Sequence, residues 1–202
     1  LKNKDLIIGF DSKLFTKKMV NTFFGKSRCT LMPIKKNLID KIWKRKIKKK
    51  INRFYNLPNY SVGFDYVDKV KKVVSFIKKQ EADYQFISAS ENNAWLLNIR
   101  GRDTDYTPIP FSYILINKNK KIKFFCDLKK INGGLRRKFN NIEFVQIELV
   151  GKVLSNINKK KFIIDKETCS YYFENIILKN NTILSFNDSI YKLKAIKSKE
   201  EI

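Results

Sequence analysis

The residue types that carry most enzyme chemistry are sparse in this chain. Histidine is absent from all 202 residues, which removes the commonest general base and metal ligand together with every Ser-His or Cys-His pair. The acids Asp103 and Asp105, like Glu200 and Glu201, are neighbours on expected loops or surfaces, where solvation is favoured because adjacent exposed carboxylates bind metals weakly. The sequence therefore predicts no catalytic residue and no metal ligand within the chain.

The cysteines point in the same direction. Cys29, Cys126 and Cys169 are far apart and show no paired spacing. An odd count without such spacing argues against a disulfide framework or a zinc site and is typical of a reducing compartment, so we expect the cytoplasm. Cys126 lies within an apolar run, which favours packing over reactivity for this thiol.

The net charge of +24 raises the possibility of nucleic-acid binding, since a basic face releases counterions when it meets phosphates. The lysines are scattered, however, and accompany an excess of Asn and Ile, as drift of an AT-rich coding sequence would also produce. The densest run, residues 44–50, is the best candidate for a real basic patch, with a solvated connector as the alternative. We expect no nucleic-acid partner, and no membrane partner because no apolar run approaches about 20 residues.

At the N-terminus the pattern predicts a β-α-β arrangement. Strands are expected over residues 6–10 and 29–34, with a helix over 13–24 between them. This fragment is too small to close a sheet alone and is typical of the end of a preceding domain. The absence of an initial Met agrees with a piece of a longer protein. Asn37 can cap a short helix that packs against a domain face through Leu38, Ile39, Ile42 and Trp43.

From residue 65 onward the periodicity becomes regular. An amphipathic helix is expected, with one apolar stripe formed by Val67, Val70, Val74 and Ile77. A strand over 84–89 follows, and Ser90 is a plausible N-cap for the helix that holds Trp95.

The remaining pattern predicts a polar hairpin and two further β-α alternations. Strands alternating with helices, interrupted by one hairpin, favour a three-layer α/β domain on a mixed sheet. The expected strands cover residues 111–116, 122–126, 142–147, 162–164 and 182–186, and the expected helices cover residues 149–157 and 169–178.

Residues 90–113 read Ser-Glu-Asn-Asn-Ala-Trp-Leu-Leu-Asn-Ile-Arg-Gly-Arg-Asp-Thr-Asp-Tyr-Thr-Pro-Ile-Pro-Phe-Ser-Tyr. A helix with a Trp, an Arg-Gly exit, an Asp-containing loop, a proline pair and an apolar strand resemble the middle, creatinase-like domain of three-domain Xaa-Pro aminopeptidases of peptidase family M24. Residues 37–43 are similar to the segment by which this family leaves its first domain. The stretch 191–202 is similar to its entry into the catalytic domain, with matches at Lys194, Ala195, Lys197, Glu200 and Glu201.

The resemblance implies a domain order. Residues 1–43 would end a first creatinase-like domain, 44–63 would be a linker, 64–190 would form the second such domain, and 191–202 would begin the connection to a catalytic domain. The implied fold is a three-layer creatinase/prolidase N-terminal-like domain with a mixed sheet, preceded by the β-α-β remnant of a similar first domain.

The resemblance also implies a parent metallopeptidase that releases the N-terminal residue from peptides with proline second. Its catalytic domain would hold a pair of divalent metals, usually manganese, whose ligand positions are outside this chain. The chain itself would be noncatalytic, would shape substrate access, and would join subunits, with a homodimer as the expected assembly. A basic nucleic-acid-binding α/β module and a domain that only dimerises stay open as alternatives.

Three residues are expected close to the substrate of the parent enzyme. Trp95 is more often a core anchor than a substrate platform. Arg100 and Asp103 lie where the chain leaves the helix, and their polar side chains can reach outward there. An ion pair within the loop is one reading of Arg100 and Asp103, and orientation toward a neighbouring active site is the other.

Overall fold

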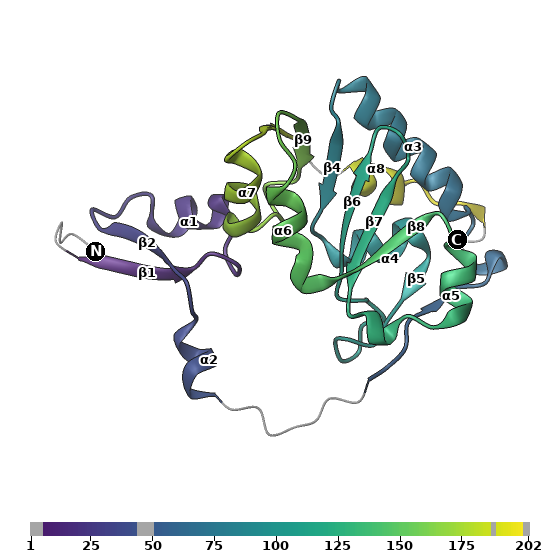
Figure 1. Cartoon of the computed structure of the whole chain (residues 1–202), viewed down its shortest axis with the longest axis horizontal. Coiled ribbons are helices and arrows are strands. Elements are labelled where there is room, and N and C mark those ends of the chain that lie inside the picture. The colour runs from purple at the N-terminus through teal and green to yellow at the C-terminus, as the bar shows by residue number, and fades with distance from the viewer. Residues whose placement is uncertain (1–5, 44–50, 187–188, 200–202) are drawn as a thin grey trace.

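The computed structural model describes residues 6–43, 51–186 and 189–199. Two parts of unequal size lie side by side in Figure 1: an N-terminal unit, residues 6–43, and a large domain that begins at residue 51. The basic run at 44–50 and the residues Glu200 and Glu201 lie outside the described residues.

The N-terminal unit has the expected β-α-β arrangement. Its two strands are parallel, with Ile7 opposite Thr30. The first helix starts four residues later than expected because the side chain of Thr16 accepts a hydrogen bond from the Met19 amide at 3.1 Å and caps it there. The elements are β1 (Ile7–Asp11), α1 (Lys17–Phe24), β2 (Thr30–Ile34) and α2 (Leu38–Ile42).

The large domain is built on a mixed sheet with the strand order β10-β9-β4-β6-β7-β8. Parallel pairing joins β10 to β9, β9 to β4 and β7 to β8, whereas β6 is antiparallel to both of its neighbours. The β6–β7 pair is the expected hairpin. The strands are β4 (Tyr84–Ile87), β6 (Tyr113–Asn117), β7 (Ile122–Cys126), β8 (Ile142–Gln146), β9 (Lys161–Ile164) and β10 (Thr182–Ser185).

Helices cover both faces of this sheet, so the predicted three-layer α/β fold is confirmed. One apolar cluster packs α3, α4, α5 and α8 on one face, and a second cluster packs α6 and α7 on the other. No helix in the described ranges is long and apolar enough to cross a membrane. The helices are α3 (Tyr66–Lys79), α4 (Ser90–Leu97), α5 (Gly133–Lys138), α6 (Val150–Ser155), α7 (Tyr171–Leu178) and α8 (Ser189–Ala195).

The buried stripe of α3 is rotated from the expected one. Val67 was expected in the core, but it is 41% exposed. The stripe begins instead at Tyr66, and it includes the long side chain of Lys69. A lysine in the stripe was not foreseen because its type normally indicates the solvent face.

The expected N-cap of α4 is also wrong. Ala89 occupies the cap position, and no side chain caps this helix end. Ser90 is the first residue of the helix, where its hydroxyl bonds to the backbone of Ser112, the residue before β6. The Ser90 hydroxyl, which the local sequence pattern predicts as a helix cap, therefore makes a tertiary contact with Ser112 instead.

The segment after residue 51 packs on the large domain. Phe54 is 1% exposed and belongs to the core cluster. Directly after it, β3 (Tyr55–Asn56) pairs antiparallel with β5 (Ile99–Arg100), the short strand that follows α4. This part of the expected connector thus helps to hold the chain that leaves α4.

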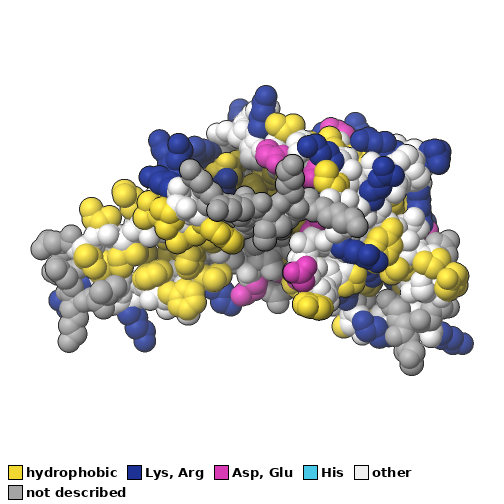
Figure 2. Space-filling view, turned by 90° about the horizontal axis from the view of Figure 1, so that it is seen from below, with side chains coloured by type: hydrophobic (Ala, Val, Ile, Leu, Met, Phe, Trp, Pro, Cys, Tyr) yellow, Lys and Arg dark blue, Asp and Glu magenta, His cyan; other side chains and the backbone are white. Residues whose placement is uncertain are grey.

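The N-terminal unit leaves much of its apolar surface open. Figure 2 shows hydrophobic side chains gathered over this unit, whereas Lys and Arg are spread around the face. The side chains of α2 and of its C-cap residue that were expected to pack against a domain face are exposed among the described residues: Leu38 63%, Ile39 57%, Ile42 78% and Trp43 60%.

Candidate functional site in the loop between α4 and β6

The site begins at the C-terminal end of α4, where two cations meet the last carbonyls of the helix. Nη1 of Arg100 donates to the carbonyl of Ala94 at 2.8 Å, and Nζ of Lys69 donates to the carbonyl of Trp95 at 3.1 Å. The helix ends at Leu97, and its C-cap residue Asn98 has a left-handed backbone with φ 53°. Cations are favoured at this negative end of the helix dipole, so both side chains stabilise the exit of the chain.

Lys69 connects α3 to this helix end. Its side chain is buried, with Nζ 2.6 Å from Oδ1 of Asn98 and 4.1 Å from the centroid of the Trp95 ring. A buried ammonium needs such partners because its desolvation is costly. Trp95 is partly buried and packs against the core cluster, and its Nε1 is buried without a hydrogen-bond partner among the described residues.

Gly101 is the point of closest approach below the helix. A Cβ placed there would lie 2.8 Å from Cα of Pro110 and 3.0 Å from the ring of Phe54. The amide of Gly101 also donates to the carbonyl of Pro108 at 3.2 Å. Only glycine leaves room for the two ends of the loop to pack on Phe54.

Asp103 closes the neck of the loop. Its Oδ2 accepts a hydrogen bond from the Phe111 amide at 2.8 Å, and its Oδ1 pairs with Nζ of Lys130. The side chains of Asp103 and Lys130 are only 9% and 19% exposed, so their ion pair is shielded. The bond from the Phe111 amide holds residues 103 and 111 together. The loop between them is therefore preorganised.

Arg100 and Asp103 thus have separate partners: Arg100 bonds to α4, and Asp103 pairs with Lys130. Of the two readings, the ion pair within the loop is therefore not the one observed. The outward reach expected of Arg100 is also corrected, because its Nη1 turns back onto the carbonyls of Ala94 and Ile99. Burial lowers the pKa of the Arg100 guanidinium, which still leaves it charged at neutral pH.

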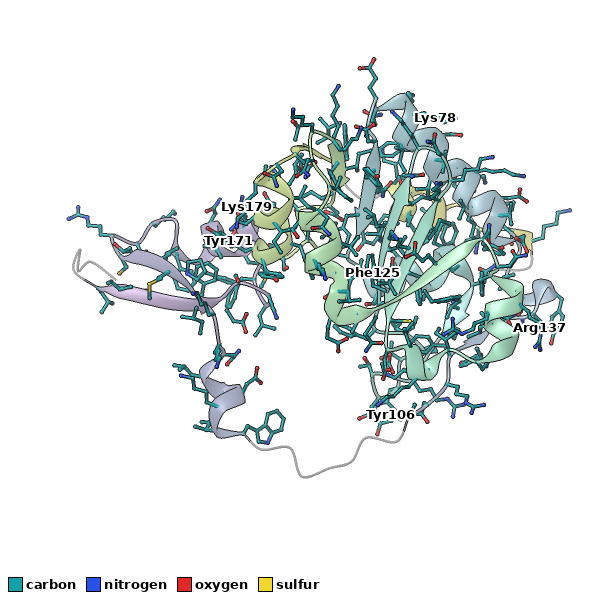
Figure 3. The ribbon with its side chains drawn as sticks, viewed as in Figure 1. Lys78, Tyr106, Phe125, Arg137, Tyr171 and Lys179 are labelled. Atoms are coloured by element: carbon teal, nitrogen blue, oxygen red, sulfur yellow. The ribbon has the colours of Figure 1, made fainter. Side chains whose placement is uncertain are left out.

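The exposed part of the loop is its tip. Tyr106 has a left-handed backbone with φ 63° and a fully exposed side chain, between the paired residues Thr104 and Thr107. Figure 3 shows Tyr106 at the lower edge of the large domain. A non-glycine residue in this backbone region costs energy, and such strain is concentrated at functional sites.

A cleft of about 370 Å³ lies beside the tip, and a second of about 690 Å³ shares part of its wall. The sequence places Asp105 on a loop only as a solvated acid, and it does not single out Arg102 or Tyr106. The Asp-Tyr-Thr-Pro turn is the signal that indicates the exposed tip. The first cleft is lined by Asn52, Tyr55, Arg102, Thr104, Asp105, Tyr106, Thr107 and Pro108.

The loop offers binding groups but no reactive pair. Among the described residues, no group of three or more Cys, Asp or Glu side chains could hold a metal ion, so the manganese pair implied by the resemblance does not fit them. Burial raises the pKa of the nearby Cys126 thiol to about 12, with smaller contributions from Asp127 and Asp103. A thiol that stays protonated is a poor nucleophile, so Cys126 does not supply a reactive thiolate beside this loop.

Comparison with known families agrees with this architecture. The model of the creatinase/prolidase N-terminal domain matches residues 45–201. The chain belongs to this family. The match begins before β3 and includes α8, so it covers the whole loop and the elements that hold it.

Relatives of this family member are similar along its whole length. It is 30% identical to Xaa-Pro aminopeptidase ApepP of Drosophila melanogaster, over 98% of this chain and 34% of that protein. It is 29% identical to Xaa-Pro aminopeptidase 1 of Dictyostelium discoideum, over 99% of this chain and 34% of that protein. The chain therefore spans about a third of the length of these relatives.

A solved structure shares the fold of both parts. The X-prolyl aminopeptidase of Caenorhabditis elegans, described as a cytosolic enzyme with a di-nuclear active site, matches with a TM-score of 0.84 at 23% identity. The match covers 96% of this chain and 33% of that one. The matched region of that structure therefore includes counterparts of both the N-terminal unit and the large domain.

Proposed function

We propose that this chain is a noncatalytic N-terminal portion of an Xaa-Pro aminopeptidase, in which it shapes the access of proline-containing peptides to a catalytic site elsewhere in the protein. The observation that carries the proposal is the similarity to Xaa-Pro aminopeptidase ApepP over 98% of this chain. The absence of histidine supports a noncatalytic role for this portion. A histidine that acts as general base or metal ligand would have to come from another part of the protein.

The loop between α4 and β6 is the proposed substrate-proximal element. Trp95, Arg100 and Asp103 would act near the substrate by holding the loop in one conformation, since their contacts are internal to the domain. The exposed Arg102 and Tyr106 would make the contacts themselves. A rigid support below exposed side chains reduces the entropy lost on binding.

The domain order implied by the sequence motifs belongs to the same proposal. Residues 1–43 would complete a preceding domain, and other residues of that domain would cover the exposed face of α2. The stretch 191–202 would lead toward the catalytic domain, where a pair of divalent metals, manganese by expectation, would be bound. The parent enzyme would be a cytoplasmic homodimer.

Calorimetry and a peptidase assay test the noncatalytic role. The purified chain should show no micromolar binding of Mn²⁺ or Zn²⁺ and no hydrolysis of a peptide with proline second. A protein in which the chain is joined to an Xaa-Pro aminopeptidase catalytic domain should hydrolyse it. Turnover by the chain alone that survives repurification would overturn the proposal.

Kinetics of that joined protein test the loop. Arg100→Ala and Tyr106→Ala should each lower kcat/KM for proline peptides by about ten-fold, equivalent to about 1.4 kcal/mol of lost transition-state stabilisation. Tyr60→Ala is the matched control, because Tyr60 is 82% exposed but lies outside the loop. Unchanged kinetics in both loop variants would remove the loop from the proposed site.

Nucleic-acid binding is tested by its salt dependence. Because Lys and Arg are spread over the face that Figure 2 shows, affinity for random duplex DNA should be weak and should collapse between about 50 and 200 mM salt. Submicromolar binding that persists at the higher salt, or that discriminates sequences, would favour the nucleic-acid-binding module instead.

A further inference from the structure

The N-terminal unit docks on the large domain at the start of α7, through main-chain hydrogen bonds. The amide of Tyr171 donates to the carbonyl of Phe15 at 2.7 Å, and the amide of Tyr172 donates to the carbonyl of Ser12 at 2.8 Å. These are the first two amides of α7, which have no partner within the helix. The N-terminal unit therefore supplies part of the cap of a helix that belongs to the other unit.

The same place brings two helix N-termini together. Thr16 is the N-cap of α1 and Ser170 is the N-cap of α7, and the two residues form an antiparallel β-bridge. Each helix begins with a partial positive charge, and α1 adds the ammonium of Lys17 at its first position. Without a negative charge between them, these helix ends would repel each other.

Glu174 supplies that charge from the first turn of α7. Its Oε1 lies 3.3 Å from Nζ of Lys17, and its side chain is only 5% exposed. Its Oε2 is buried and has no hydrogen-bond partner among the described residues. The carboxylate is thus shielded from water. This shielding strengthens its attraction to Lys17 and to both helix ends, because the local dielectric constant is low.

An aromatic pair lies beside Lys17, whose Nζ is 5.6 Å from the centroid of the Tyr171 ring. Phe10 of β1 is 5% exposed, and its ring meets that of Tyr171 at a centroid distance of 5.2 Å and an interplanar angle of 89°. Figure 3 shows Tyr171 at the boundary between the two units. A second ion pair, Lys18 with Glu167, lies at the rim with side chains 59% and 54% exposed, where water screens it.

We propose that the start of α7 is a docking socket for the β1–α1 connection, and that Glu174 is the residue that makes this docking possible. The two units then form one rigid body held by the socket rather than by the covalent connection between them. This inference goes beyond the proposed function and does not depend on any activity of the chain.

Cleavage of the connection tests the socket on the whole chain. A recognition sequence for a specific protease is inserted between Lys46 and Ile47, the chain is cleaved, and native mass spectrometry follows the two fragments on dilution. The cleaved wild-type chain should stay associated at micromolar concentration. Dissociation of its fragments at that concentration would overturn the proposal.

The charge pair is tested in the same assay. Glu174→Gln keeps the size of the side chain and should weaken association of the fragments by ten-fold or more. Lys17→Met should also weaken it, and the double variant Lys17→Met/Glu174→Leu should recover part of the loss because no unpaired buried charge remains. Glu167→Gln is the matched control at the exposed pair and should change the affinity by less than about two-fold.

Circular dichroism separates loss of docking from loss of folding. If Glu174→Gln retains the helical signal and the cooperative melt of the large domain while its fragments separate, the assignment stands. If it unfolds the large domain, Glu174 is a structural residue of α7. If it changes the affinity of the fragments as little as Glu167→Gln does, Glu174 does not hold the socket. Either result shows that the proposed role is wrong.

Discussion

The N-terminal unit and the large domain both alternate strands with helices, but they differ in how much of their sheet is buried. In the large domain, both faces of the sheet are covered, and Phe124, Phe125 and Phe162 have no exposed surface. In the N-terminal unit, Ile7 and Met32 lie on one face of a two-stranded parallel sheet and are 61% and 52% exposed. Parallel strands are normally buried on both faces.

The difference shows what an α/β unit needs in order to be complete. Similar apolar residues are available in both parts, but only the large domain has enough helices to bury them from two sides. The N-terminal unit instead compensates at one end, where Phe10 packs on Tyr171 of α7. Its remaining apolar surface is what a larger domain or a partner would cover.

The largest contrast should come from one pair of phenylalanines. Phe162→Ala in β9 removes a fully buried ring and should lower the free energy of unfolding by about 3–5 kcal/mol. Phe23→Ala in α1, where the ring is 63% exposed, should change it by less than about 1 kcal/mol. Equal losses in urea titrations of the two variants would show that α1 is as packed as the core, which would break the comparison.

A pair of glycines sharpens the comparison within the large domain. Gly101→Ala places a Cβ against Pro110 and Phe54 and should cost about 1–3 kcal/mol through overpacking. Gly133→Ala begins α5, with its nearest atom at 3.6 Å, and should be neutral or stabilising by about 0.5–1 kcal/mol. Thermal melts of both variants decide this, and a stable Gly101→Ala would mean that the loop neck is loose.

The buried cysteines of the large domain should make its stability fall at alkaline pH. Burial raises the pKa of Cys126 to about 12 and also raises that of Cys169. Between about pH 9 and pH 12 the unfolded thiol of Cys126 is ionised while the folded one keeps its proton, so stability should fall by about 1.4 kcal/mol per pH unit for this thiol. Urea titrations at several pH values measure the slope.

The control for this effect is in the N-terminal unit. Cys29 is only partly buried, so a thiol reagent at pH 8 should label it well before the two buried thiols. Cys126→Ala should reduce the alkaline slope of stability. A slope that is unchanged in Cys126→Ala would show that other groups cause it.

The smallest expected effect separates two neighbouring arginines. Arg100→Ala leaves the carbonyl of Ala94 without its guanidinium partner and should cost about 1–2 kcal/mol. Arg102→Ala, on the exposed side of the loop, should stay within about 0.5 kcal/mol. If the two variants melt alike, Arg100 does not hold the helix end, and its role near the substrate would have to be direct.

Periodicity was enough to predict most of the elements. The hairpin, the β-α alternations and the mixed sheet follow from runs of apolar residues and from the turn between β6 and β7. The Asn37 cap is confirmed as well, because its amide oxygen accepts from the Ile39 amide two residues away. Such bonds join neighbours in sequence, so their pattern is visible without a tertiary structure.

The loop was predicted only in part. The segment with Trp95, Arg100 and Asp103 was recognised from its residues, but the partners of those side chains were not. Lys69 is 29 residues before Asn98, and Asp103 is 27 residues before Lys130. No local pattern pairs residues at such separations, and a buried lysine contradicts the average preference of its type.

The sequence by itself determined the layers, because the spacing of apolar residues sets which faces must be buried. It also determined that no His-based chemistry is possible within this chain, since composition needs no coordinates. The tertiary structure decided how the two parts meet. The amides of Tyr171 and Tyr172 donate hydrogen bonds to the backbone carbonyls of Phe15 and Ser12. Such main-chain groups occur in nearly every residue, so no pattern of side chains predicts which of them will pair.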